Sequence, residues 1–150
     1  MTKRMIFLAA SAAALSLMVA GSSSAHHALV AGHQPPPAVM SGTEVDLAVE
    51  IASTCTLVCS QVEVTMNYFD DEGFFRQQIQ YTRQGAPAGV QVFTIPADHV
   101  GGETLTYWFT AEQSQCGIDM ECHTHEASTP ARGAHSVQVI TMFEGYWPSP

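Results

Sequence analysis

Short runs of alternating apolar and polar residues recur along this chain after residue 44. In the first run, over 45–51, valine, leucine or isoleucine takes every second position, and acidic residues or alanine take the others. Side chains two residues apart point to the same face of a strand, so this period predicts a half-buried β-strand. Turn residues separate further runs of the same kind. The predicted strands cover 45–51, 62–68, 74–81, 90–95, 105–111 and 137–141, with a short first strand within 28–39.

These runs, without a sustained helical period after the amino-terminal segment, predict an all-β fold. A count of about seven strands at this spacing favours an immunoglobulin-like or fibronectin type III-like β-sandwich. The segment 113–133 lacks apolar alternation and is predicted to be a long irregular loop. Residues 146–150 are expected to form a C-terminal tail, which leaves 26–145 as one sandwich domain.

The first 25 residues have the three parts of an export signal. Lys3 and Arg4 precede an apolar run over 5–20. Small residues follow, with Ser23 and Ala25 in the spacing at which signal peptidase cleaves. The apolar run is too short to predict a membrane span. The sequence therefore predicts an exported protein, periplasmic or extracellular, whose mature chain 26–150 contains no membrane span.

The charge of the chain narrows the class of partner. The net charge is −9, and removing Lys3 and Arg4 with the signal changes it to −11. Such an acidic chain is not expected to bind nucleic acid or an anionic membrane surface by charge. The acidic stretch at 70–72 is predicted to be a solvated hairpin turn, because its spacing lacks the alternating ligands of a calcium loop.

All four cysteines, Cys55, Cys59, Cys116 and Cys122, lie in the predicted mature chain. An even number of cysteines in an exported chain predicts two disulfides. Of the three possible pairings, the simplest has one disulfide within each neighbouring pair, Cys55 with Cys59 and Cys116 with Cys122. The alternative is that disulfides connect the two cysteine segments to each other. A zinc site made from the thiolates and His123 fits the spacing poorly.

Several motifs between residues 33 and 111 support the sandwich prediction. They are His33-x-Pro35-Pro36 followed by Gly42, Val64-x-x-x-Tyr68, Phe93-Thr94-Ile95-Pro96-Ala97 before Val100-Gly101-Gly102, and Leu105-x-Tyr107-x-Phe109-x-Ala111. Together with the last strand, they resemble a bacterial family of secreted immunoglobulin-like or fibronectin-like accessory domains. The resemblance implies the sandwich fold and a role as a spacer, adhesion module or enzyme appendage. Within the first motif, His33 is expected to order the first strand.

An immunoglobulin-like topology brings distant segments to one end of the sandwich. The amino terminus, the B–C loop over 52–60 and the F–G loop over 114–135 are expected to share this end. Both cysteine pairs then lie on the same rim, together with three histidines. These are His26, His123 and His125. The acidic turn at 70–72 and His99 are expected at the opposite end.

His123 and His125 are two residues apart, so on extended backbone their imidazoles face the same side and can share one metal ion. With His26 at the mature terminus, they form a nitrogen-rich set that suits copper. This arrangement resembles the CopC-type copper proteins, which are small exported sandwiches whose mature form begins with a ligating histidine. The resemblance implies a Cu(II) site at His26, His123 and His125. The alternative is that these are solvated loop histidines.

The chain contains no Gly-x-Ser-x-Gly elbow and no His-Glu-x-x-His motif, so we expect no enzyme. The first predicted function is a non-catalytic binding or structural module without a cofactor. It would contact an unknown protein or carbohydrate through the B–C and F–G rim. The alternative is a small periplasmic copper-binding protein. Trp108, with Tyr146 and Trp147, is a candidate aromatic contact patch unless its own chain covers it.

Overall fold

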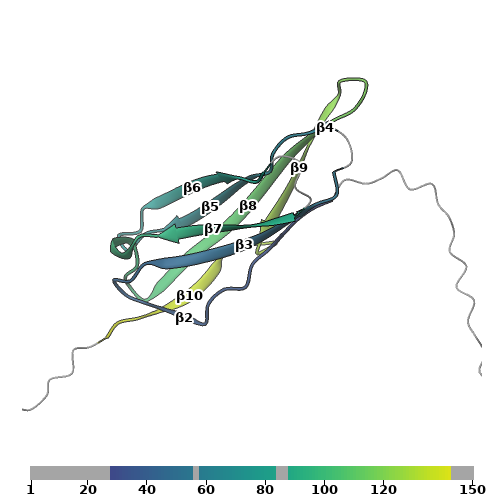
Figure 1. The fold of residues 1–150 in the computed structure, drawn as a ribbon. Helices are drawn as coiled ribbons and strands as arrows, with labels where there is room; N and C mark the ends of the chain where they lie inside the picture. Colours follow the sequence, from purple (N-terminus) through teal and green to yellow (C-terminus); the bar gives the residue numbers. More distant parts are fainter. Residues whose placement is uncertain (1–27, 56–57, 84–87, 143–150) are drawn as a thin grey trace, which may run out of the picture.

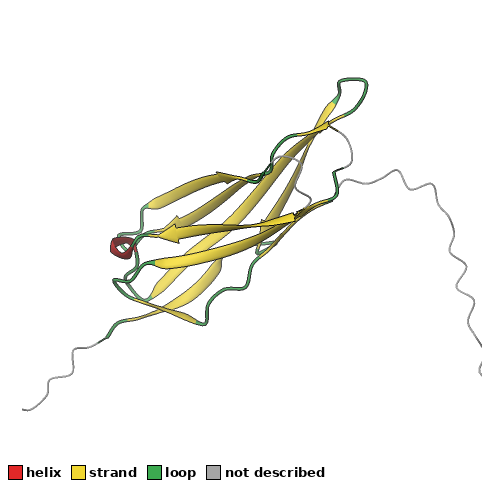
Figure 2. Ribbon diagram, viewed as in Figure 1, coloured by secondary structure: helices red, strands yellow, loops and turns green. Residues whose placement is uncertain are grey.

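The computed structural model describes residues 28–55, 58–83 and 88–142. In these ranges, ten β-strands form two sheets, and the one helical element is the 3₁₀ turn η1 (Ala97–His99). Figures 1 and 2 show an elongated sandwich whose strands run along its length. The fold is therefore an all-β sandwich, as the alternation predicts. The predicted signal at 1–25, His26 and the tail at 146–150 lie outside the described residues.

The smaller sheet consists of β1 (Leu29–Gly32), β3 (Val45–Ser53) and β7 (Ala88–Ile95), in that order. Both of its strand pairs are antiparallel. Every second residue of β3 is buried, which is the pattern that the sequence predicts for this segment. Leu47 lies opposite Phe93, and this register turns the apolar side chains of both strands inward.

The larger sheet is built around its longest strand, β8 (Thr104–Cys116). All of its described strand pairs are antiparallel except the parallel pair of β2 and β10. Two shorter partners, β4 (Val58–Cys59) and β9 (Cys122–Thr129), pair with the far part of β8. The order of the sheet is β2 (Ala38–Met40), β10 (His135–Ile140), β8, β5 (Glu63–Phe69) and β6 (Phe75–Tyr81).

The core lies between the two sheets and is centred on large aromatic side chains. Tyr107 and Phe109 of β8 are fully buried, and the ring centroid of Phe93 on β7 lies 5.6 Å from that of Phe109. Burying a side chain such as phenylalanine stabilises a fold by roughly 1.5–3 kcal/mol. The other large side chains that are fully buried are Leu47, Val49, Val62, Val64, Met66 and Ile95.

Two glutamine side chains of β6 close one side of the sandwich. The Nε2 atoms of Gln78 and Gln80 donate to the backbone carbonyl oxygens of Thr94 and Val92, each over 2.8 Å. β6 and β7 are terminal strands in the orders of their sheets, so these bonds tie the edge of one sheet to the edge of the other. They satisfy acceptors that an edge strand otherwise leaves to water.

Replacing Gln78 and Gln80 together by alanine is expected to lower the free energy of unfolding by about 1–2 kcal/mol. Each hydrogen bond contributes roughly 0.5–1.5 kcal/mol net, and both are lost. Urea denaturation measures the change. Gln138→Ala removes an exposed glutamine on β10 and is the matched control, expected within about 0.5 kcal/mol of the parent chain. An unchanged urea midpoint in the double variant would mean that the sheets hold together without these bonds.

The predicted irregular loop at 113–133 is wrong. β8 continues to Cys116, and the chain returns along it as β9, with Phe109 opposite Thr129 and Cys116 opposite Cys122. β9 contains small and polar residues, so its alternation carries no hydrophobic signal. β9 forms because the backbone N–H and C=O groups along one edge of β8 would otherwise lack hydrogen-bond partners in the sheet. The structure has ten strands in the described ranges, whereas the sequence predicts about seven. One predicted strand corresponds to two, β1 and β2, and the alternation predicts neither β4 nor β9.

Candidate functional site

The end of the sandwich that holds the cysteines also holds the start of the described chain. The amide of Ala28 donates to Oγ1 of Thr54 over 2.8 Å, and the amide of Thr54 donates to the carbonyl oxygen of Ala28 over 2.9 Å. Antiparallel pairing places Leu29 opposite Ser53, just before the first cysteine segment. The predicted meeting of the amino-terminal part with the B–C segment is therefore confirmed from Ala28 onward.

Backbone pairing joins the two cysteine segments to each other. β4 lies against the end of β8, with Val58 opposite Cys116. The amide of Ser60 donates to the carbonyl oxygen of Ser114 over 2.9 Å. The two cysteine segments thus form one continuous rim, at the end where Figure 1 shows β4 and the far part of β8 together.

Each segment of the rim is closed by its own disulfide, Cys55–Cys59 in the first and Cys116–Cys122 in the second. The local pairing, which is the simplest of the three, is therefore confirmed. None of the described cysteines is free, so no thiolate remains there for a zinc site. The Cys116–Cys122 disulfide joins two strand ends rather than lying within an irregular loop, because Cys116 ends β8 and Cys122 begins β9.

A buried glutamine anchors the rim to the body of the sandwich. Oε1 of Gln113 accepts a hydrogen bond from Oγ of Ser53 over 2.5 Å, and its Nε2 donates to the carbonyl oxygen of Ser60 over 2.9 Å. One side chain on β8 therefore holds the end of β3 and the residue after β4. A buried polar group that is satisfied on both sides favours a single arrangement of its neighbours.

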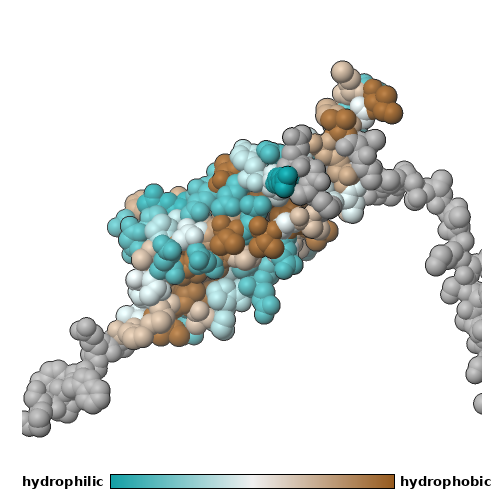
Figure 3. All heavy atoms as spheres, viewed as in Figure 1, coloured by the Kyte–Doolittle hydropathy of each residue, from teal (hydrophilic) through white to brown (hydrophobic). Residues whose placement is uncertain are grey.

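Beyond this anchor, the β8–β9 hairpin projects from the body as a narrow tip of residues 117–121 (Figure 1). The amide of Gly117 donates to the carbonyl oxygen of Glu121 over 2.8 Å and closes the turn. Ile118 and Met120 in the tip are 98 % and 88 % exposed, and Val58 on the neighbouring β4 is exposed too. The space-filling view shows hydrophobic atoms at this projecting end (Figure 3).

The backbone of the tip holds an unfavourable conformation. Met120 has φ of 66°, in the left-handed region that costs roughly 1–2 kcal/mol for a residue with a Cβ. Its amide donates to the carbonyl oxygen of Gly117 over 3.1 Å, and the disulfide behind it closes the hairpin. Asp119 and Glu121 lie beside the two apolar side chains and are exposed. The tip therefore presents apolar groups with negative charges around them.

β9 places His123 and His125 on one side of the hairpin, opposite Gln115 and Gln113 of β8. The prediction that these two imidazoles share a side is therefore confirmed. His123 is exposed and His125 is half-buried. Within the described ranges, no three histidine, cysteine or acidic side chains lie together in a way that could hold a metal ion. The third predicted ligand, His26, lies outside these ranges.

His33 joins the two sheets where the chain leaves β1. Its Nδ1 lies 2.6 Å from the carbonyl oxygen of Ala48 on β3, and its Nε2 lies 2.8 Å from the hydroxyl oxygen of Tyr107 on β8. A carbonyl oxygen only accepts, so Nδ1 donates, and Nε2 of the neutral ring accepts from the Tyr107 hydroxyl. Burial raises the pKa of Tyr107, which keeps this hydroxyl protonated. His33 follows β1 and therefore fixes the chain that leaves this strand, whereas the ordering of the first strand itself stays a prediction.

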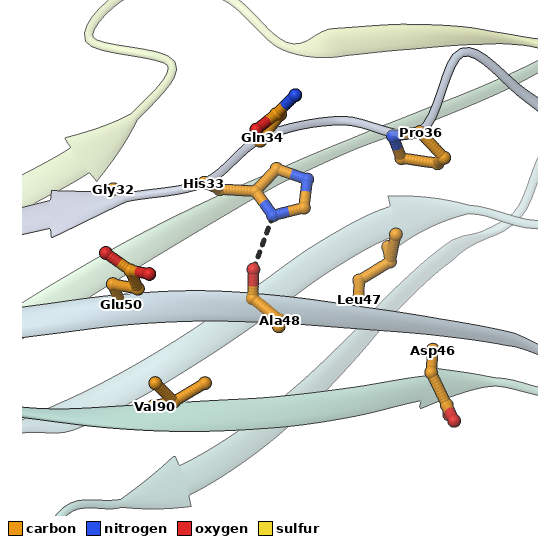
Figure 4. Close-up of a pocket in the computed structure, with 9 residues that line it drawn as sticks. All are labelled: Gly32, His33, Gln34, Pro36, Asp46, Leu47, Ala48, Glu50 and Val90. Carbon is orange, nitrogen blue, oxygen red and sulfur yellow. Dashed lines mark hydrogen bonds between the residues drawn. The ribbon is translucent and has the colours of Figure 1, made fainter.

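A groove of about 520 Å³ lies beside His33, over β3 and next to Val90 of β7 (Figure 4). Figure 4 shows the imidazole pointing to the carbonyl of Ala48. Asp46 in the same groove accepts a hydrogen bond from Oγ1 of Thr94 over 2.6 Å. The polar side chains of His33 and Asp46 in the groove thus serve contacts of the fold.

His135 packs against His33 from the other side of the junction, with ring centroids 5.1 Å apart. Burial lowers the pKa of His135, and the nearby His33 lowers it further. In the folded chain His135 therefore resists protonation, whereas in the unfolded chain it binds a proton near pH 6.5.

The stability of the protein is expected to fall as the pH drops from 7.5 to 5. The unfolded chain binds more protons than the folded chain in this window, because the folded pKa of His135 lies below its unfolded value of 6.5. The contribution of His135 is therefore fully present above pH 6.5 and is lost on acidification. Urea midpoints at several pH values measure the slope, and His135→Gln should flatten it. An equally steep slope in His135→Gln would assign the effect to other groups.

The opposite end of the sandwich contains the acidic turn and His99, as predicted, but the expectation of a solvated turn is wrong for Asp70. The side chain of Asp70 is almost fully buried and accepts from the amides of Glu72 and Phe74 and from Nε of Arg76. Burial alone would raise the pKa of Asp70, but these donors outweigh it and lower the pKa. Nδ1 of the half-buried His99 lies 2.8 Å from the hydroxyl oxygen of the buried Tyr68 on β5, which couples η1 to the core.

An aromatic cluster missed at the sequence level lies on the outer face of the larger sheet. Trp108 is half-buried, and the ring centroids of Phe69 and Phe75 each lie 6.0 Å from its own. The predicted partners of Trp108, Tyr146 and Trp147, lie outside the described residues. Both phenylalanines occupy outward positions, but only the register between β5 and β6 shows that they are neighbours.

Comparison with known proteins adds no relative. No protein-family model matches the sequence, and no curated protein matches it either. The resemblance to accessory domains therefore stays a prediction from the motifs, and function is argued from geometry. In the described part of the chain, no helix has the length and apolar character that a membrane crossing needs.

Proposed function

We propose that this protein is an exported, non-catalytic binding module that contacts a partner protein through its rim. Export is supported by the amino-terminal sequence pattern and by two disulfides, which persist in oxidising compartments. We also propose that the sandwich has the immunoglobulin-like topology that the motifs predict. The contact surface is the tip of residues 117–121 together with Val58 of β4.

The observation that carries the proposal is the exposure of Ile118 and Met120 on a braced hairpin. Large apolar side chains that are almost fully exposed to water remove the most apolar area from water when they enter a partner's pocket, so they stabilise a complex most. The disulfide and the Gln113 anchor order the tip before binding, so less conformational entropy is lost on association. The partner is expected to offer an apolar pocket bordered by basic groups, which complement Asp119 and Glu121.

Photochemical crosslinking from the tip tests the proposal. p-Benzoylphenylalanine in place of Ile118 is expected to crosslink one defined protein in the cells that export the chain. Introducing Met120→Ser into the same chain should weaken that crosslink. The matched control is p-benzoylphenylalanine in place of Ile140, which is half-exposed on β10 away from the rim. The same products from both positions, or crosslinks to lipid alone, would rule out a protein partner at the tip.

Copper binding is the second candidate, because β9 turns His123 and His125 to one side at the end where the described chain begins. Metal analysis and intact mass of the mature protein, exported with its own signal in copper-supplemented medium, test it. We expect one equivalent of copper on a chain that starts at His26. Replacing His123 and His125 by alanine should abolish the copper, whereas His99→Ala should keep it. Copper retained in the double variant would eliminate this site.

A further inference from the structure

The outer face of the larger sheet carries three aromatic rings that form a platform. Phe69 on β5 and Phe75 on β6 are paired in register and are 40 % and 53 % exposed. The rings of Phe75 and Trp108 are inclined by 30°, with centroids 6.0 Å apart. The ring centroid of Phe69 lies 5.9 Å from that of Phe75 and 6.0 Å from that of Trp108. A soluble chain rarely leaves three such rings clustered on a sheet face without use.

An amide pair lies directly beside the platform. Nε2 of Gln77 donates to Oδ1 of Asn67 over 3.0 Å, and Asn67 lies opposite Trp108 on β8. Among the described residues, neither Nδ2 of the buried Asn67 nor Oε1 of Gln77 has a further hydrogen-bond partner. Gln77 is exposed, so its Oε1 can accept a hydrogen bond from a ligand, whereas Asn67 is only 5 % exposed and holds Gln77 in place. The neighbouring outward positions, Thr65 and Thr110, are uncharged hydroxyl groups.

Farther along the same face, three carboxylates stand in one row across the strands. Glu63 on β5 lies opposite Glu112 on β8, and Glu112 lies opposite Glu126 on β9. The hydroxyl of Tyr81 donates to Oε2 of Glu63 over 3.0 Å. Trp108 and Glu112 are four residues apart on β8, which corresponds to about 13 Å along a strand. A linear ligand on this face can therefore contact both the rings and the carboxylates.

We propose that this face binds an uncharged, β-linked polysaccharide with all-equatorial pyranose rings, a site separate from the tip. Such a ring has flat faces of C–H groups and an edge of hydroxyl groups. The electron-rich faces of Phe75 and Trp108 attract the polarised C–H groups, and the burial of apolar area adds to this attraction. The carboxylates and Oε1 of Gln77 accept hydrogen bonds from the hydroxyl edge. The acidic charge of the chain disfavours an anionic polysaccharide.

The surroundings of the rings favour a glycan over a protein at this face. The centre of a protein interface is a desolvated apolar patch, with an outer ring of contacts that excludes water. Here the exposed Gln77 lies between Phe75 and Ile79 on β6, and three carboxylates lie farther along the face, so polar and apolar groups alternate around the rings. A ligand with both apolar faces and many hydroxyl groups meets this pattern without leaving polar groups unpaired.

Native affinity electrophoresis of the full mature chain in gels containing hydroxyethylcellulose tests the proposal. The polysaccharide is expected to retard the protein, and Phe75→Ala should weaken its binding by about tenfold, the loss of one ring contact. Phe75→Tyr keeps a ring and should restore retardation. Val92→Ala, which removes an exposed valine on the outer face of the smaller sheet, is the matched control and should migrate like the parent chain. Equal retardation by dextran, or none by hydroxyethylcellulose, would overturn the proposal.

Tryptophan fluorescence adds a readout that does not depend on a substitution in the platform. The chain has two tryptophans, and Trp147→Phe leaves Trp108 as the only emitter. Cellohexaose should shift the emission of Trp108 to shorter wavelength in this variant, because a sugar ring displaces water from its face. Ile118→Ser should leave the shift unchanged, which separates this site from the tip. No shift at saturating cellohexaose would count against the site even if the polysaccharide retarded the protein in the gel.

Discussion

Replacing His33 by alanine is expected to lower the free energy of unfolding by about 3 kcal/mol. The imidazole bonds Ala48 of β3 and Tyr107 of β8, so one side chain connects the two sheets. Its removal leaves the buried Tyr107 hydroxyl without its partner, which costs roughly 1–3 kcal/mol. The loss of ring packing against Phe109, at a centroid distance of 5.0 Å, adds to this cost.

Two variants separate the parts of this effect. Tyr107→Phe removes the hydroxyl but keeps the ring, and it should cost about 1 kcal/mol, because Nε2 of His33 then lacks its donor. His33→Gln keeps polar atoms on a flexible chain and should fall between the parent and His33→Ala. Urea denaturation at pH 7.5 measures all three. A loss below about 1 kcal/mol in His33→Ala would mean that the junction of the sheets does not depend on this histidine.

Removing the tip disulfide, by Cys116→Ser with Cys122→Ser, is expected to destabilise the chain by about 2 kcal/mol. The two cysteines are six residues apart, and the chain-entropy estimate for a loop this short is near that value. We expect much of the change to be local. Beyond Ser114, backbone pairing connects the hairpin to the body through the two-residue strand β4, so the hairpin should open before the sandwich unfolds.

Hydrogen exchange followed by mass spectrometry distinguishes local from global opening. In the double variant, exchange should rise at 115–125 and stay slow in β3 and β5. Cys55→Ser with Cys59→Ser is the matched comparison, since it opens a loop of similar length on the other side of the rim. Uniformly faster exchange throughout the chain would show that the tip disulfide supports the whole fold.

Strands with a strong apolar period could be predicted from the sequence, and strands without one could not. β3 and the first part of β8 alternate clearly because one face of each packs on the core. β9 and β4 are held by backbone pairing to β8, and backbone groups are the same in every residue. The sequence pattern therefore has no signal for these two strands.

The candidate site, too, was predictable only where the sequence carries a signal for it. The local disulfides follow from the short spacing of Cys55 with Cys59 and of Cys116 with Cys122, and the rim follows from strand order. The projecting tip depends on the unpredicted β9, so the exposure of Ile118 was not foreseeable. The aromatic platform needed the register between strands, which fixes which outward side chains become neighbours.

The glutamine bridges from β6 also bear on how copies of this chain behave when they are crowded together. Fibrous aggregation begins when a strand from one molecule bonds to the open border of a sheet in another. On β7, the carbonyl groups of Val92 and Thr94 are already occupied by Gln80 and Gln78, so an incoming strand would have to displace them. The two glutamine side chains that help to close the sandwich thereby also protect the edge strand β7 from aggregation.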